Sequence, residues 1–116
     1  MRYFLSRLYL RTIWSWQGAA SAWKTEHSLR TWVWANALSA VLAFSLDLTP
    51  AERALILALG ILILAAELLN TAIEDAVDYI SKEEHPLAKR AKDAGSAGVA
   101  VTGIAAGVAW VVILIG

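Results

Sequence analysis

A row of polar side chains in the middle of the chain has the residue types and the spacing of a catalytic site. Glu67, Asn70, Thr71, Glu74 and Asp78 recur every three or four residues, so an α-helix places them on one face. A strongly apolar run precedes them without a turn signal, and one helix should therefore carry both. Carboxylates that leave an apolar membrane segment are costly unless they have a function. The pattern predicts a catalytic face at a membrane surface.

Glu67 is the first acid of the row and the candidate general base. Counted from a helix start near Pro50, it lies about 25 Å along the helix, just inside an apolar core about 30 Å thick. Burial there favours the protonated carboxyl, which suits a group that must take up a proton. The alternative is a structural Glu paired inside the bundle. Asn70 fits three roles: orienting this carboxylate, binding a phosphate oxygen or bridging helices.

Glu74 lies two turns beyond Glu67, nearer water, and is a candidate metal ligand. Magnesium prefers oxygen ligands, usually one or two carboxylates plus the phosphates themselves. Glu26, expected at a similar depth, is the second candidate, although a lone acid near a membrane face is more often only solvated. Asp75 and Asp78 are interpreted as ordinary water-side charges.

Lys92 and Asp93 open the last apolar segment and form a second polar group. Lys92 offers a point charge for phosphate, and Gly95 permits a close backbone approach. By itself Lys92 is better explained by snorkelling. Asp93 is harder to explain structurally, because an acid beside an apolar span is disfavoured.

The composition predicts one small membrane domain and excludes several classes. The chain has 116 residues, of which 59% are hydrophobic and 17% charged, below the roughly 25% charged residues of soluble domains. A net charge of zero excludes a global basic field for nucleic acid, and the lack of cysteine excludes thiol chemistry. The Gly-rich phosphate loops of soluble kinases are missing. His27 and His85 lack metal-ligand spacing, and we expect His85 to be a loop residue.

We expect an all-α membrane protein with an N-terminal helix lying in the interface, at about residues 3–23. This segment mixes aromatic residues with a polar stripe of Arg7, Arg11 and Ser15, which is typical of interfacial helices. The two arginines also argue against a cleaved signal peptide. Gly18 and the small residues after it indicate a bend or break.

Three membrane crossings are expected after it, at about 29–47, 50–80 and 90–115. Thr49, Pro50 and Glu52 form the capping box of the second one. The last crossing carries a surface of small residues suited to close helix packing. Nine basic residues against one, Arg53, place the N-terminus and the 81–92 loop in the cytoplasm and the C-terminus outside. The nine are Arg2, Arg7, Arg11, Lys24, Arg30, Lys82, Lys89, Arg90 and Lys92.

Two motifs resemble the signature of a known family, the small prokaryotic integral-membrane diacylglycerol kinases, which include the undecaprenol kinases. They are Glu67-x-x-Asn70-x-Ala72-x-Glu74-x-x-x-Asp78 and His85-Pro86-Leu87-Ala88-Lys89-x-Ala91-Lys92-Asp93, the latter followed by Gly95-Ser96-Ala97. The similarity extends over nearly the whole chain, including the interfacial helix, Trp16-x-Gly18 and the region of Glu26.

The resemblance implies a homotrimer with active sites shared between subunits, ATP, magnesium, and direct phosphoryl transfer to a lipid hydroxyl. By position, Glu67 would be the base and contact the lipid together with Ser96, while Glu26 and Glu74 would hold the metal. The nucleotide and phosphate site would comprise Arg7, Ser15, Glu26, Asn70, Glu74, Lys92 and Asp93.

We therefore predict a diacylglycerol kinase of the bacterial inner membrane that makes phosphatidic acid. The close alternative is an undecaprenol kinase, against which Gly95-Ser96 gives only a slight preference. The others are a small proton-coupled transporter with Glu67 as proton carrier and a non-enzymatic assembly subunit. Thr25 and Trp32 depart from the family pattern. The pattern has an Asn at the position of Thr25 and an acidic residue at the position of Trp32.

Overall fold

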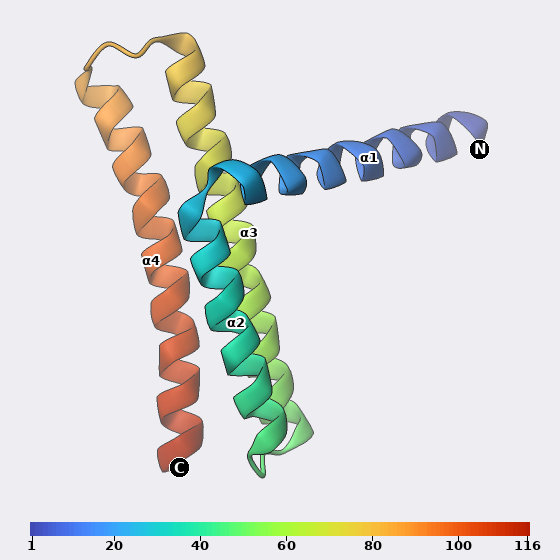
Figure 1. The fold of residues 1–116 in the computed structure, drawn as a ribbon, viewed down its shortest axis with the longest axis vertical. Coiled ribbons are helices and arrows are strands. Elements are labelled where there is room, and N and C mark those ends of the chain that lie inside the picture. Colours follow the sequence, from blue (N-terminus) through green and yellow to red (C-terminus); the bar gives the residue numbers. More distant parts are fainter.

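The computed structural model describes all 116 residues and contains four α-helices. Their bounds are Arg2–Thr25 for α1, His27–Ser45 for α2, Pro50–Ile80 for α3 and Pro86–Ile115 for α4. The helices α2, α3 and α4 run side by side, whereas α1 projects away from them as an arm (Figure 1). The predicted all-α fold is confirmed.

α3 is the central helix, because it packs against both α4 and α2. It begins where the capping box predicts: the backbone N–H of Glu52 donates to Thr49 Oγ1 at 3.2 Å, and the Glu52 carboxylate accepts from the Thr49 N–H at 2.8 Å. Pro50 occupies the first turn. α2 and α4 reach each other through side chains, since Trp110 Nε1 donates to Ser39 Oγ at 2.9 Å.

Two predictions about helix ends are wrong. Gly18 does not break α1, which is continuous to Thr25 because the helical hydrogen bonds tolerate one glycine among good helix formers. The chain turns instead at Glu26, whose φ of −108° and ψ of 104° are extended. His85 lies outside the helices, as expected, but the last helix begins at Pro86 and not near residue 90, because His85 Nδ1 accepts from the Leu87 N–H at 3.0 Å and caps it.

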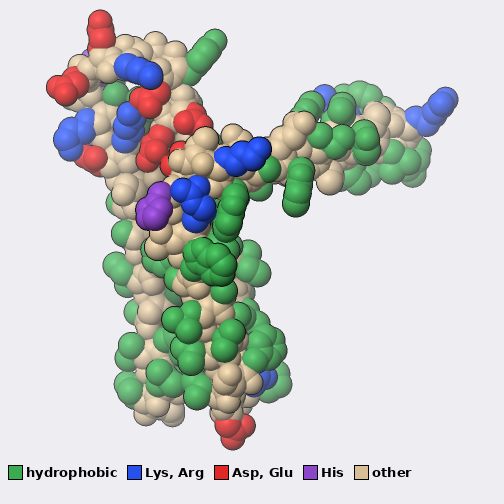
Figure 2. Space-filling model, viewed as in Figure 1, with side chains coloured by type: hydrophobic (Ala, Val, Ile, Leu, Met, Phe, Trp, Pro, Cys, Tyr) green, Lys and Arg blue, Asp and Glu red, His purple; other side chains and the backbone are tan.

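Two helices, α3 and α4, are long and apolar enough to cross a membrane. α2 does not reach that level, because polar residues fill its first turns, among them His27, Ser28 and Arg30. Acidic and basic side chains gather where the loop joins α3 to α4 and near the junction of α1 and α2 (Figure 2). Only nine of the 116 residues are buried, so most apolar side chains lie on the outside of the single chain.

Candidate active site

Glu67 is the only charged residue that the fold buries, with 5% of its surface exposed. It lies on α3 and faces the start of α2, where Ser28 Oγ donates to Glu67 Oε2 at 3.1 Å. One turn later, Thr71 Oγ1 donates to the backbone carbonyl of Glu67 at 3.0 Å, so this hydroxyl does not bind the Glu67 carboxylate. A buried acid with one hydroxyl partner and no cation partner is a candidate for proton transfer.

Asn70 and Glu74 form the next part of the face. Asn70 Nδ2 donates to Glu74 Oε1 at 3.1 Å, one helical turn apart, and both side chains are half-buried. Of the three roles considered for Asn70, orientation of Glu67 is not what the structure shows, because its amide nitrogen is bound to Glu74. Its Oδ1 is buried without any hydrogen-bond partner.

Gly95 on α4 makes room for this amide. A Cβ atom at Gly95 would overlap Asn70 Oδ1, so only glycine lets α4 approach α3 so closely. A buried oxygen that lacks a partner costs free energy. The packing of α4 on α3 therefore leaves the Asn70 oxygen unsatisfied within this chain.

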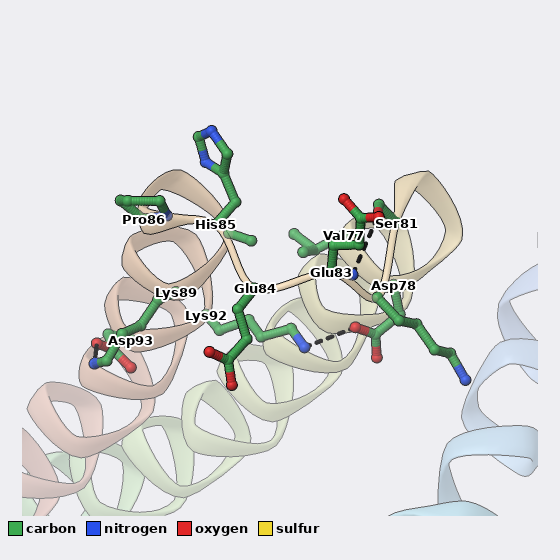
Figure 3. A pocket seen from close by; sticks show the side chains of 12 residues that line it. Val77, Asp78, Ser81, Glu83, Glu84, His85, Pro86, Lys89, Lys92 and Asp93 are labelled. Carbon is green, nitrogen blue, oxygen red and sulfur yellow. Dashed lines mark hydrogen bonds and ion pairs between the residues drawn. The ribbon is translucent and has the colours of Figure 1, made fainter.

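Lys92 and Asp78 close the face at its loop end. Lys92 Nζ lies 2.7 Å from Asp78 Oδ1, and this ion pair ties α4 to α3 (Figure 3). Asp78 is thus not the ordinary surface charge that the sequence pattern predicted. The signal was its position in the polar row, three turns beyond Glu67, but only the packing of α4 supplies the partner.

A cleft of about 720 Å³ lies beside this ion pair, between the end of α3, the loop and the start of α4 (Figure 3). Asp78, Lys92 and Asp93 line it together with polar loop residues. Asp93 is exposed and pairs with Lys89 on the same helix. Ser96 is exposed further along α4. The cleft is open to solvent and its lining carries charged side chains, which a charged ligand could contact.

Glu26 lies at the junction of α1 and α2 and is half-buried. The Ser28 contact brings this junction to the level of Glu67, whereas Glu74 lies about 10 Å further along α3 by the helical rise. No group of three or more acidic or histidine side chains is close enough to hold a metal ion. A shared metal between Glu26 and Glu74 remains a prediction.

Arg7 and Ser15 lie on α1, away from the face on α3. Both are exposed, and the first half of α1 extends away from α3 and α4 (Figure 1). Ser15 Oγ donates to the Arg11 carbonyl at 2.8 Å. Within one chain these two residues therefore do not join the other candidates.

Thr25 and Trp32, the two residues that depart from the family pattern, both make contacts in the fold. Trp32 packs α2 against α4, where a Cβ atom at Gly103 would lie 3.1 Å from its ring. Thr25 Oγ1 donates to the Ser21 carbonyl at 3.0 Å at the end of α1. The Trp32 ring thus packs α2 against α4 in a way that an acidic side chain would not.

Comparison with known proteins assigns the chain. The family model described as prokaryotic diacylglycerol kinase matches residues 13–114, which include every candidate except Arg7. A Pseudomonas aeruginosa protein named diacylglycerol kinase is 43% identical over 112 residues, covering 97% of this chain and 91% of that protein. Escherichia coli K12 has one that is 40% identical over 100 residues, covering 86% and 82%. One from Helicobacter pylori is 38% identical over 91 residues, covering 78% and 71%. The chain therefore belongs to the prokaryotic diacylglycerol kinase family.

Proposed function

We propose that this protein is a lipid kinase that transfers the γ-phosphate of ATP to the hydroxyl of diacylglycerol, giving phosphatidic acid and ADP. The observation that carries the proposal, beside family membership, is the buried carboxylate of Glu67 at the head of a polar face that ends in Lys92. The face combines a proton acceptor in apolar surroundings with charged groups near water. A lipid alcohol and a water-soluble phosphate donor require that combination.

Each part of the face has a task in phosphoryl transfer. The Glu67 carboxylate takes the proton of the lipid hydroxyl. The hydroxyl oxygen of the lipid then bonds to the γ-phosphorus of ATP, and the bond between that phosphorus and the ADP oxygen breaks. Lys92 neutralises charge on the phosphate, and the Asn70 amide orients it. Positioning and charge neutralisation are the main demands of this reaction. Asp93, Ser15 and Arg7 complete the nucleotide contacts, and Ser96 the lipid contacts.

The residues present fit a magnesium ion. Glu74 supplies a half-buried carboxylate, the unpartnered Oδ1 of Asn70 is an oxygen close by, and both suit a hard cation. Glu74 and Glu26 would hold the ion, which when bound offsets the negative charge of the phosphates. Few protein ligands are needed, since magnesium in kinases is usually bound by one or two carboxylates plus the phosphates.

The protein acts in the bacterial inner membrane, with the N-terminus and the 81–92 loop in the cytoplasm, where ATP is available. The charge asymmetry of the sequence and the charged loop end of the helix bundle support this orientation. α2 is then the third crossing beside α3 and α4. Its polar first turns lie at the cytoplasmic surface, and α1 lies along that surface.

A homotrimer with shared active sites completes the proposal. Arg7 and Ser15 lie on an arm that extends away from its own chain's face, so a neighbouring subunit's face is where they are useful. The exposed small and aliphatic side chains of α4 offer a packing surface, with Val101, Ile104 and Val108 each more than half exposed.

The test is purified protein in phosphatidylcholine vesicles with ATP and magnesium, offered diacylglycerol or undecaprenol in parallel. We expect phosphatidic acid, measured by mass spectrometry, to form at many times the rate of undecaprenyl phosphate. Transfer to undecaprenol alone would replace the lipid substrate. Transfer to neither lipid would contradict the kinase proposal.

Gly95→Ala should slow the kinase several-fold without unfolding it. The added Cβ displaces the Asn70 side chain and breaks its bond to Glu74. Gly98→Ala is the matched control, because nothing lies within 4 Å of a Cβ there. Both changes favour the helix by roughly 1 kcal/mol relative to glycine, so the two variants differ in the displacement of Asn70 and not in helix propensity. Equal turnover of the two variants would exclude a role for the Asn70 geometry.

Glu74→Gln should raise the magnesium concentration needed for half-maximal activity by about tenfold or more, since a neutral amide is a weaker ligand for a hard cation. The measurement is a magnesium titration of initial rates at saturating ATP. Asp75→Asn, an exposed acid on the same helix, is the control and should titrate as the wild type does. An unchanged titration for Glu74→Gln would remove Glu74 as a metal ligand.

A further inference from the structure

Ser28, which has no task in the proposed reaction so far, is in contact with the candidate base. Ser28 lies in the first turn of α2, 39 residues before Glu67, and its Oγ is 3.1 Å from Glu67 Oε2. This is the only side-chain hydrogen bond that the Glu67 carboxylate makes. We propose that Ser28 is a positioning residue, whose hydroxyl holds the Glu67 carboxylate in the orientation that accepts the proton of the substrate. The proposal rests on the proposed function.

The contact fixes one carboxylate oxygen and leaves the other for the substrate. Glu67 Oε2 accepts from Ser28, while Oε1 has no protein partner. Oε1 can therefore accept from a substrate hydroxyl, while Ser28 prevents the carboxylate from rotating away.

The end of α2 that carries Ser28 is itself polar. Ser28 is the second residue of α2, and the Glu26 side chain does not cap this helix end. The first N–H groups of a helix lack partners and carry partial positive charge. A hydroxyl donor gives the buried carboxylate a polar partner, which offsets part of the cost of burying it.

Ser28 has no feature in the sequence that would single it out. It is exposed, polar and next to His27, like many residues at a helix start. Only the packing of α2 against α3 places its hydroxyl on the carboxylate. Because the side chain is exposed, there is space for an added methyl group, so threonine can replace serine while keeping a hydroxyl at the same place.

The first test compares kcat and KM of Ser28→Ala and Ser28→Thr in diacylglycerol vesicles. We expect kcat of Ser28→Ala to fall about tenfold, the size of one hydrogen bond to a charged group, with KM for ATP within about twofold. Ser28→Thr should restore most of kcat. Ser45→Ala, at the other end of α2, is the matched control, because its hydroxyl only bonds the Val41 carbonyl. Wild-type kcat in Ser28→Ala would overturn the proposal.

The second test needs no catalysis and measures how fast dicyclohexylcarbodiimide modifies Glu67. This reagent reacts with carboxyl groups in apolar surroundings, so a carboxyl group that the Ser28 hydroxyl no longer holds should be reached and labelled faster. We expect Ser28→Ala to label several-fold faster than wild type, Ser28→Thr to label at the wild-type rate, and Glu67→Gln to remain unlabelled there. Equal labelling of Ser28→Ala and wild type would overturn the proposal. Failure of wild type to phosphorylate any lipid would instead contradict the proposed function, whatever the labelling shows.

Discussion

Glu67→Gln is expected to reduce lipid phosphorylation by about 10²- to 10⁴-fold, the range for loss of a general base. Glutamine has nearly the same shape and can still accept the hydrogen bond from Ser28, so the contact between α2 and α3 survives. It cannot take up the proton of the lipid hydroxyl. The loss should therefore appear in kcat, measured with saturating diacylglycerol and ATP, while the helical content and the melting temperature stay close to those of the wild type.

Asp75→Asn is the control for removing a negative charge from the same helix. Asp75 is exposed and makes no hydrogen bond or ion pair, so its turnover should stay within about twofold of the wild type. A Glu67→Gln protein with kcat within threefold of the wild type would exclude Glu67 as the base. The buried carboxylate would then be a structural group.

Lys92→Met is expected to lower kcat/KM for ATP by about 10²- to 10³-fold, the cost of removing one preorganised group that stabilises transition-state charge. Methionine keeps the length and the apolar stem but lacks the ammonium. The substitution has a second effect, since it also breaks the ion pair with Asp78 that joins α3 to α4. Steady-state kinetics with varied ATP measure the sum of the two effects.

Asp78→Asn separates the two effects. If Lys92 acts on phosphate, Asp78→Asn should be much milder than Lys92→Met, because the ammonium remains. Arg90→Gln removes a nearby exposed positive charge and should change kcat/KM by no more than about twofold. Equal losses in Lys92→Met and Asp78→Asn would show that Lys92 only ties the two helices together.

The helices could be predicted where short-range signals define them. Thr49, Pro50 and Glu52 make up a local capping box, and α3 begins and ends at the predicted residues, Pro50 and Ile80. The last helix was harder, because charged residues before residue 90 made its first turn look like a loop. His85 and Pro86 are in fact a cap and a first-turn proline. At Gly18 the error was the opposite one, because a break was predicted where the helix continues. A single glycine costs only about 1 kcal/mol, and the neighbouring residues sustain the helix.

The polar face could be predicted only as far as one helix allows. Periodicity alone places Asn70 and Glu74 side by side, and the structure confirms their contact. The partners of Glu67 and Asp78 come from α2 and α4, at separations of 39 and 14 residues. Such pairs depend on how the helices pack, which the spacing within one helix does not determine. Ser28 was missed entirely for this reason, and Asp78 was taken for a surface charge.

The most direct test of the central claim follows the phosphate itself. Purified protein in diacylglycerol vesicles is mixed with ATP labelled at the γ-phosphorus and with magnesium, and the label is then sought in extracted lipid and in the protein. We predict that it enters phosphatidic acid with the wild type, that it stays in ATP with Glu67→Gln, and that neither protein becomes labelled. Wild-type protein that leaves the lipid unlabelled, or equal lipid labelling by both proteins, would contradict the account.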